Sequence, residues 1–481
     1  MAERRTLVVG SGAGGLAMAL LLARAGRPVT LLEVQKNIGG NLRRFVRGGV
    51  RFDTGYHFAG GLAGVTGQLM ELLGIADLVK HHQISNTVHL AASGNDIVLP
   101  AGCGIDGAID IYSRCFPGDA AGVKAFYSAF REVWRATPMH DLESRDLAAP
   151  PVLSRYDLNT VDELCGSWRL SPAAATALNC FALCHGTPPE LAPMSFHARV
   201  GYSLCEELSR PEGGGDTLIE AFKREAAKLG IEVRTGTTVE RFAARDADGK
   251  YREAVLADGT TLPVEEVYFT NHPASVLAML PPEARAPALT RRCARLREST
   301  SFFCAYFTVD GGSPEGLISY MSHDDLDMIL NHRDGAYSTG YMIENEPDAN
   351  GNLVTAISSF RTVPPVFEAP SLNHAARLKD SAYQEYKAHV AQEIAADLVK
   401  VHPEFEGRLR LRESGSPLTC RDYAPPYGSA YGACCVVGEA RLCGHIGSNF
   451  YLAGQSAMVP GVLGTMLTSL SVCRRNGITE K

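Results

Sequence analysis

The sequence lacks both a basic excess and an apolar run long enough to cross a bilayer. Its 481 residues include 46 Lys and Arg against 53 Asp and Glu, which gives a formal net charge of −7. A nucleic-acid-binding protein usually presents a basic face, so this charge argues against that class of partner. No apolar run approaches the roughly 18 residues of a membrane helix, and residues 1–5 are too polar to begin a signal peptide. We therefore expect a cytoplasmic location, with attachment to one membrane face as the alternative.

Tryptophan is scarce, whereas cysteine is common but arranged for neither disulfides nor metal. The two tryptophans are Trp134 and Trp168. The 13 cysteines are odd in number and begin only at residue 103, so without a signal peptide reduced thiols are expected. Cys434, Cys435, Cys443 and His445 are candidate ligands of a metal cluster. No second pair of ligands accompanies it, so we predict no metal site.

The first 33 residues form a complete strand–turn–helix–strand pattern. Residues 6–10 read as a buried strand, 16–25 as a helix and 28–33 as the next strand. Between the first two lies the turn Gly10-Ser11-Gly12-Ala13-Gly14-Gly15. Gly10 permits the tight turn, Gly12 lets the backbone approach a pyrophosphate, and Gly15 lets helix and strand pack closely. Glu33, about 20 residues further on, is placed to accept hydrogen bonds from ribose hydroxyls.

Other segments show the usual helix and strand signals. A helix is expected over residues 119–135, with Val123, Phe126, Phe130 and Trp134 on one face. That face suits core packing, and one-leaflet membrane contact is the alternative. The prolines of residues 136–200 predict short helices and loops. A long core helix is expected over about 374–401, with an apolar stripe at Leu378, Ala382, Tyr386, Val390, Ile394 and Leu398.

The residues after Glu33 carry a family resemblance. Gly39 and Gly40 follow it closely, and Phe52-Asp53-Thr54-Gly55-Tyr56-His57 lies beyond. This order resembles the FAD-dependent phytoene desaturases, carotenoid isomerases and retinol saturases. The resemblance implies FAD contacts from the glycine pair and from the segment around Asp53. Asn41 stands where the family often has Arg or Lys, and Arg43 or Arg44 is a candidate replacement.

The resemblance continues along the chain and adds further expected cofactor contacts. Val239 falls where the family passes a backbone strand over the adenine. Gly454 and Gln455, followed by Gly461, Val462 and Leu463, resemble the segment that closes over the flavin. A helix N-terminus aimed at the flavin would stabilise its anionic reduced form, and a generic helix start is the alternative reading.

Candidate catalytic residues come from two places. Arg421, Asp422 and Tyr423 lie in a stretch that resembles the family's cavity lining. They could orient a polar end group or relay a proton, and a structural ion pair is the alternative. His57 is a candidate to approach the flavin face, although a lone histidine is more often structural.

These observations predict an α/β fold of the amine-oxidase-like superfamily. A discontinuous Rossmann-like FAD-binding domain (1–90, 205–285 and 435–481) would carry an inserted α+β substrate domain (91–204 and 286–434). The expected activity is hydride exchange between FAD and a carbon–carbon bond of a long apolar, isoprenoid-like substrate. Saturation, desaturation and isomerisation share that step, with a slight preference for a saturase or isomerase. The alternatives are an amine oxidase and a non-enzymatic prenyl carrier similar to the Rab-GDP-dissociation inhibitors. No second Gly-x-Gly-x-x-Gly turn is present, so either an external electron partner or a reaction that is redox-neutral overall is expected.

Overall fold

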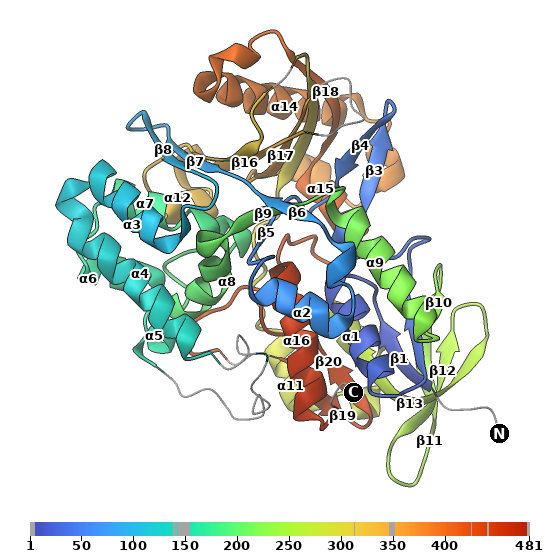
Figure 1. Cartoon of the computed structure of the whole chain (residues 1–481). Helices are drawn as coiled ribbons and strands as arrows, with labels where there is room; N and C mark the ends of the chain where they lie inside the picture. The colour runs from blue at the N-terminus through green and yellow to red at the C-terminus, as the bar shows by residue number, and fades with distance from the viewer. Residues whose placement is uncertain are drawn as a thin grey trace.

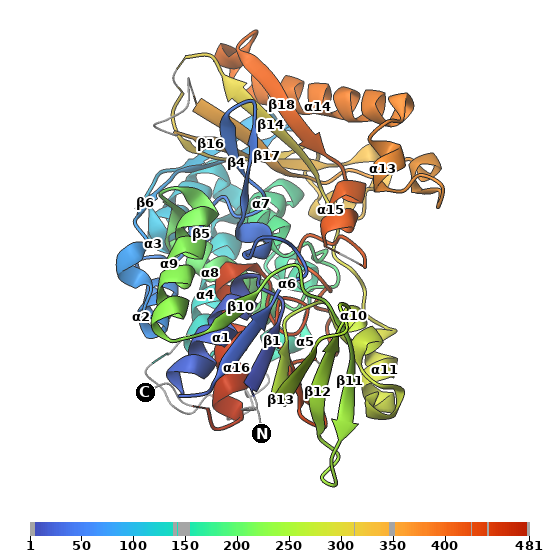
Figure 2. The same cartoon turned by 90° about the vertical axis from the view of Figure 1, so that its right-hand side faces the viewer.

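Two β-sheets with helices around them make up the fold. The computed structural model describes residues 5–137, 142, 154–311, 313–345, 352–424, 426–439 and 442–478. Figure 1 shows one sheet at the lower right, near the N-terminus, the other at the top, and a group of helices at the left. The view turned by 90° shows the two sheets stacked one above the other (Figure 2). The predicted α/β class is confirmed.

The lower sheet has eight strands drawn from three distant parts of the chain. Its strands are β1 (Arg5–Val9), β2 (Val29–Leu32), β10 (Glu232–Arg234), β11 (Val239–Arg245), β12 (Tyr251–Leu256), β13 (Thr261–Phe269), β19 (Gly444–Gly447) and β20 (Phe450–Leu452). The order is β10-β2-β1-β13-β12-β11, with β20 beside β13 and β19 beside β20. The strands β10, β2, β1, β13 and β20 are parallel to their neighbours in this group.

The parallel part of this sheet is covered by helices that pack around α1. The helices next to the sheet are α1 (Ala13–Arg24), α2 (Val65–Leu73), α9 (Gly214–Lys228) and α16 (Gly461–Arg475). Every residue of α1 from Gly14 to Leu22 is buried, which explains why this helix is apolar on all sides. The Ser469 hydroxyl of α16 donates a 2.8 Å hydrogen bond to the Gly14 carbonyl. This contact fixes the C-terminal helix against the glycine turn.

The upper sheet has seven strands and is mainly antiparallel. Its strands, in sheet order, are β18 (Leu409–Gly415), β14 (Phe303–Val309), β17 (Asn352–Ser359), β16 (Ser338–Glu344), β15 (Gly316–Met321), β7 (Asn86–Leu90) and β8 (Asn95–Leu99). The predicted domain boundary at residue 90 therefore falls inside one sheet. β7 pairs with β8 as a hairpin and with β15 in parallel, so β7 belongs with the inserted segments.

Helix α14 (Ser381–Val401) packs on the upper sheet, but it is shorter than the sequence predicted. A separate short helix, α13 (His374–Arg377), precedes it. The Asp380 side chain accepts a 2.7 Å hydrogen bond from the Tyr383 N–H and starts α14 as a new helix. Leu378 consequently lies outside the helix and is 59% exposed.

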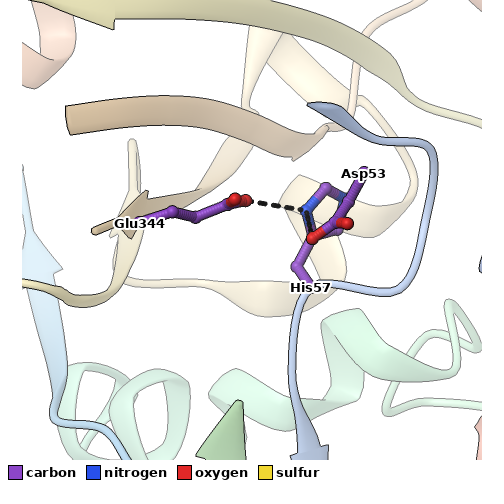
Figure 3. Close-up of side chains that lie close together, drawn as sticks. All are labelled: Asp53, His57 and Glu344. Carbon is purple, nitrogen blue, oxygen red and sulfur yellow. Dashed lines mark ion pairs between the residues drawn. The ribbon is translucent and has the colours of Figure 1, made fainter. Parts of the chain in front are cut away.

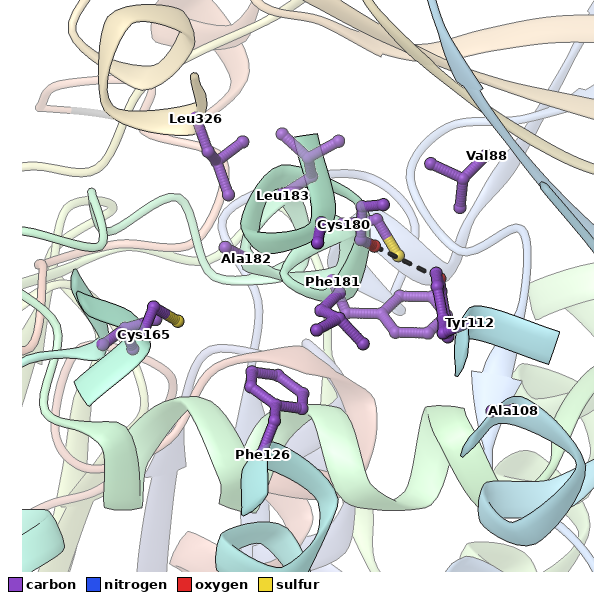
Figure 4. Packing of buried hydrophobic residues seen from close by; sticks show 14 of the residues in the cluster. Val88, Ala108, Tyr112, Phe126, Cys165, Cys180, Phe181, Ala182, Leu183 and Leu326 are labelled. Atoms are coloured by element: carbon purple, nitrogen blue, oxygen red, sulfur yellow. Dashed lines mark hydrogen bonds between the residues drawn. The ribbon is translucent and has the colours of Figure 1, made fainter. Parts of the chain in front are cut away.

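The helical region covers residues 104–206. Its helices are α3 (Gly104–Cys115), α4 (Ala120–Arg135), α5 (Arg155–Leu158), α6 (Val161–Ser167), α7 (Pro172–Leu178) and α8 (Met194–Glu206). Figure 4 shows Phe126 of α4 pointing into a core that also contains Tyr112 and Phe181. Val123, Phe126 and Phe130 are all buried, so this face is core and is not available to a membrane. The alternative of one-leaflet contact through α4 is therefore wrong. The parts 138–141 and 143–153 of the predicted loop-rich stretch lie outside the described residues.

Smaller elements connect the two sheets. They include the ribbon of β3 (Arg44–Arg47) and β4 (Val50–Asp53) and the three-stranded sheet of β5 (Ala59–Gly60), β9 (Leu208–Pro211) and β6 (His81–Gln83). The remaining short helices are α10 (Pro273–Met279), α11 (Pro287–Cys293), α12 (Leu326–Leu330) and α15 (Pro417–Tyr423). All 13 cysteines are free thiols. Among the described residues, no helix combines the length and the apolar character needed to cross a membrane.

Candidate active site

A cavity of about 1300 Å³ lies between the two sheets. It is lined at one end by the glycine turn before α1 and at the other by residues of the upper sheet, including Cys304, Tyr306 and Leu317. Sites for one small ligand usually measure about 300–1,000 Å³. This cavity is therefore large enough for more than one bound molecule.

The glycine turn forms an open cradle at the start of α1. Gly12 has φ −65° and ψ 179° and caps the helix without a side-chain hydrogen bond. A Cβ added to Gly12 would meet no heavy atom within 4 Å, because that position opens into the cavity. The other two glycines are fixed by packing: a Cβ on Gly10 would lie 2.8 Å from Thr270 Oγ1, and one on Gly15 would lie 1.9 Å from the Gly10 carbonyl oxygen. The unpaired N–H groups at the helix start favour an anion in this cradle.

Glu33 lies at the cavity wall with its carboxylate already oriented. Its Oε2 accepts hydrogen bonds from the Ser11 N–H at 3.0 Å and from the Ser11 hydroxyl at 2.5 Å. Its Oε1 accepts one from the Gln35 N–H at 2.8 Å. A carboxylate has about four acceptor positions, so this orientation leaves capacity for a ligand hydroxyl.

The glycine pair brings the next loop against the same cradle. Gly39 and Gly40 have φ values of +117° and +53°, and the Gly39 N–H donates to the Ser11 carbonyl at 3.0 Å. Asn41 and Arg43 also line the cavity, and the Arg43 Nε donates to the Gly40 carbonyl at 3.0 Å. Arg43 and Arg44 were the two candidates to replace the family's basic residue. Arg43 is bound to the Gly40 carbonyl beside the cradle, whereas Arg44 pairs with Asp53.

The other cofactor residues predicted from the sequence reach the same cavity from distant segments. Those that line it are Gly10, Gly12, Ala13, Gly14, Gly15, Glu33, Gly39, Gly40, Asn41, Val239, Gly454, Gln455, Gly461, Val462 and Leu463. Gly454 needs to be glycine because its φ is +93° and a Cβ would lie 2.6 Å from the Thr270 carbonyl oxygen. Helix α16 begins at Gly461, so its N-terminus points at the cavity, as the sequence predicted.

Asp53 is the exception among the predicted cofactor residues, because it does not line the cavity. It is buried beside His57 and Glu344, as Figure 3 shows. It forms ion pairs with Arg44 Nε at 2.9 Å and with Arg210 Nη1 at 2.9 Å. Arg210 Nη2 also pairs with Glu344 Oε2 at 2.6 Å. Burial, together with the charge of Glu344, raises the pKa of Asp53 above its usual value, and Arg210 partly offsets this rise. The expected contact of Asp53 with the cofactor is thus corrected: the residue holds the cavity wall together.

His57 stands between this cluster and the cavity. Its side chain is 1% exposed, and its Nδ1 lies 3.6 Å from Glu344 Oε1 and 3.8 Å from Asp53 Oδ2. Neither ring nitrogen has a hydrogen-bond partner among the described residues, although His57 lines the cavity. Asp53, His57 and Glu344 are close enough to suggest a metal site. The guanidinium groups of Arg44 and Arg210 neutralise both carboxylates and disfavour a cation there.

Arg421, Asp422 and Tyr423 do not interact with one another as the sequence suggested. Arg421 Nη2 pairs with Glu368 Oε2 at 3.0 Å and does not line the cavity. Asp422 lines the cavity and pairs with Arg377 Nη2 at 2.6 Å and His374 Nδ1 at 2.7 Å. Tyr423 lines the cavity and is 58% exposed. Asp422 therefore forms structural ion pairs, the alternative named for it above. Its partners come from α13 and not from the neighbouring Arg421.

Several lining residues were not predicted from the sequence. Burial raises the pKa values of Cys184, Cys304 and Tyr431. These groups are therefore neutral and contribute to a largely apolar wall. Lys387 and Arg47 also line the cavity, from α14 and β3. The buried position of Lys387 could have been found from the helical spacing, because it is four residues from the buried Tyr383.

The tryptophans are not part of the site. Trp134 stacks on Tyr202 with ring centroids 4.3 Å apart, and Trp168 packs against the core of the helical region. Neither lines the cavity. Aromatic side chains in the cavity wall are therefore phenylalanines and tyrosines.

Comparisons with known proteins agree with this geometry. Residues 13–320 match a family model described as flavin containing amine oxidoreductase. The chain is 22% identical to all-trans-retinol 13,14-reductase of Danio rerio over 97% of its own length and 84% of that protein. It is 28% identical to hydroxyneurosporene desaturase of Cereibacter sphaeroides over 57% of each chain. An oxidoreductase from Methanosarcina mazei has a similar fold, with a TM-score of 0.64 at 15% identity, covering 97% of this chain and 99% of that one.

Proposed function

The chain belongs to the flavin containing amine oxidoreductase family, and we propose that it binds FAD and acts on a carbon–carbon bond of a long, apolar, isoprenoid-like substrate. The single observation that carries this proposal is the cavity. It runs from a cradle suited to a dinucleotide to an apolar region that a polyene or isoprenoid chain would fit.

The dinucleotide form of the flavin is supported by the two ends of the cradle. Gly12 leaves space for a phosphate at the start of α1, and Glu33 presents carboxylate oxygens at the end of β2. Val239 and the first residues of α16 both line the cavity, which supports an adenine site beside Val239 and a flavin-ring site at the helix start. A flavin without the adenosine half would leave the Glu33 end of the cradle unused.

A hydrocarbon substrate is supported by the wall of the cavity and by the relatives. The wall contains Phe181, Leu183, Phe302 and Leu317, and burial raises the pKa values of its Cys184 and Tyr431 side chains. A bound flavin supplies two-electron hydride transfer, which is the chemistry that desaturation, saturation and isomerisation share. Similarity over nearly the whole chain to a retinol reductase favours reduction of a carbon–carbon double bond.

His57 is the residue we assign to proton transfer. Reduction of a double bond adds one hydride and one proton, so a cavity residue that holds a proton is needed. His272 and His374 also line the cavity, but Glu298 and Asp422 engage them at 2.9 and 2.7 Å. His57 is buried and neither of its ring nitrogens is hydrogen-bonded within the described chain. Among the three histidines of the wall it is thus the one whose ring nitrogens remain available to hold a proton.

The test is an anaerobic reaction of the flavin-loaded protein. The bound flavin is reduced with dithionite, mixed with all-trans-retinol or with a carotenoid, and followed by visible absorbance and product mass. We expect flavin reoxidation together with a product two mass units heavier than the polyene. Reduction of the oxidised flavin by amines, with no reaction of any polyene in either direction, would instead identify an amine oxidase.

His57→Gln separates the proton step from the flavin. We expect bound flavin to be retained and product formation to fall about 10²–10⁴-fold, the usual contribution of a general acid. A mutant that turns over at the wild-type rate would remove His57 from the mechanism.

A further inference from the structure

Lys387 is a buried cation in the cavity wall with an incomplete set of partners. It extends from α14, is 9% exposed and lines the cavity. Its Nζ lies 3.8 Å from Glu413 Oε1, which is beyond hydrogen-bond distance. An ammonium group has three donors, and no hydrogen bond from Lys387 Nζ to another side chain is found among the described residues, so these donors are open to a ligand in the cavity.

Glu413 cannot fully compensate Lys387, because its carboxylate is shared. Its Oε2 pairs with Arg47 Nε at 2.8 Å, and its Oε1 accepts from the Ser414 N–H at 2.9 Å. Burial lowers the pKa of Lys387, Glu413 raises it, and the charge of Arg47 lowers it again. The group therefore consists of two cations around one carboxylate.

The neighbouring charges on the cavity wall do not supply the missing anion. Asp422 lines the same cavity, but its two oxygens are bound by Arg377 and His374. The cavity wall here thus carries three cations, Arg47, Lys387 and Arg377, against two carboxylates, Glu413 and Asp422, an excess of one cation. Of these cations Lys387 is the one without a close hydrogen bond to a carboxylate, so the excess is centred on it.

We propose that Lys387, assisted by Arg47, binds the anionic end group of an otherwise apolar substrate. This inference rests on the proposed function and narrows it, because it assigns the substrate a carboxylate or phosphate at one end. Such a group would provide the charge that the cluster lacks, at hydrogen-bond distance from Lys387 Nζ. The apolar part of the substrate would then extend along the cavity from this anchor.

A purely structural role for Lys387 makes a different prediction. If the residue only ties α14 to β18, its replacement lowers stability and leaves ligand preference unchanged. An anchoring role instead changes the preference between ligands that differ only in charge. The two roles are therefore separated by comparing an acid with its alcohol.

The experiment measures binding of matched polyenes to the flavin-loaded protein by equilibrium dialysis. All-trans-retinoic acid and all-trans-retinol share one carbon skeleton and differ at the end group, and geranylgeranyl monophosphate is compared with geranylgeraniol in the same way. Wild type is expected to prefer the anionic member of a pair about 10- to 100-fold, the range for hydrogen bonds to a charged group. A preference within the retinoid pair indicates a carboxylate substrate, and one confined to the geranylgeranyl pair indicates a phosphate.

Variants locate the anchor. Lys387→Met should remove the preference, while the affinity for the alcohol changes far less, and Lys387→Arg should restore it. Arg47→Gln, at a half-exposed side chain, gives a second test that does not disturb the buried position and should reduce the preference. Lys223→Met removes the same charge from the exposed face of α9 and is the matched control.

Two results would overturn the inference while leaving the proposed function in place: equal binding of acid and alcohol by wild type, or a preference that survives in Lys387→Met and in Arg47→Gln. Failure of every polyene to bind the flavin-loaded protein would contradict the proposed function itself, and the anchor with it.

Discussion

Gly12 allows cofactor binding to be separated from folding. Its φ of −65° and ψ of 179° are available to any residue, and an added Cβ meets no atom of the described chain within 4 Å. Gly12→Val should therefore fold, with a loss of at most about 1 kcal/mol in the free energy of unfolding, since the change concerns one helix cap. The added methyl groups would occupy the space into which the cofactor phosphate is expected to fit.

The effect on cofactor affinity follows from the contacts that the side chain displaces. Two hydrogen bonds between backbone N–H groups and a charged phosphate contribute about 1.5–3 kcal/mol each. Losing both corresponds to about 3–6 kcal/mol, or a rise in the Kd for FAD of about 10²–10⁴-fold. Gly12→Ala, with a smaller side chain, should give an intermediate rise.

Two matched variants control this experiment. Gly166→Val also places a side chain where no atom lies within 4 Å, but far from the cavity, and should keep its cofactor. Gly15→Ala should fail to fold normally, because its Cβ would lie 1.9 Å from the Gly10 carbonyl oxygen. Visible absorbance gives the flavin content, calorimetric titration of the cofactor-free protein gives the Kd, and circular dichroism gives the fold. Full flavin occupancy and an unchanged Kd in folded Gly12→Val would refute the assignment of the cradle.

Three further predictions concern charged residues. Arg210→Met should lower the free energy of unfolding by about 3–5 kcal/mol in urea titrations, because two buried carboxylates lose their shared cation; a loss below 1 kcal/mol would contradict this role. Asp422→Asn should lower the melting temperature and retain turnover per bound flavin, since its oxygens are bound by other side chains; loss of turnover would instead make Asp422 catalytic. Burial, with nearby carboxylates, raises the pKa of Asp327 to about 6. Ionisation of this carboxyl group therefore lowers the free energy of unfolding as the pH rises from about 4 through 6. Asp327→Asn should therefore be more stable than wild type by about 1–2 kcal/mol at pH 7.5, with the difference vanishing near pH 4; a constant difference across this range would contradict the shift.

The cofactor end of the cavity could be predicted because its signals are local. The strand, the glycine turn and the helix are contiguous in sequence, so their arrangement depends on local geometry. The glycines of the turn are required because a side chain there would clash within the same unit. The helix start at Gly461 likewise follows from the residues around it. The limits of the long helix were harder to predict, because the capping of α14 by Asp380 outweighed an apolar stripe that continued to Leu378.

The charged partners could not be predicted, because adjacency in sequence does not bring side chains together on a helix. Arg421 and Asp422 are successive residues of α15 and point about 100° apart around its axis. One reaches Glu368 and the other reaches Arg377 and His374. The position of Asp53 could not be predicted either. Nothing in the segment around it indicated that the distant Arg210 would pair with it in the protein interior.

The sequence by itself determined the α/β class, the glycine turn at Gly12 and the start of α16 at Gly461, because each depends on contiguous residues and backbone sterics. Only the tertiary structure decided that His57 has no hydrogen-bond partner among the described residues, that Asp53 lies behind the cavity wall and that Lys387 enters the cavity. Those properties depend on which strands and helices, separated by 100 residues or more in some cases, pack against one another, and that packing fixes where each charge finds its partner.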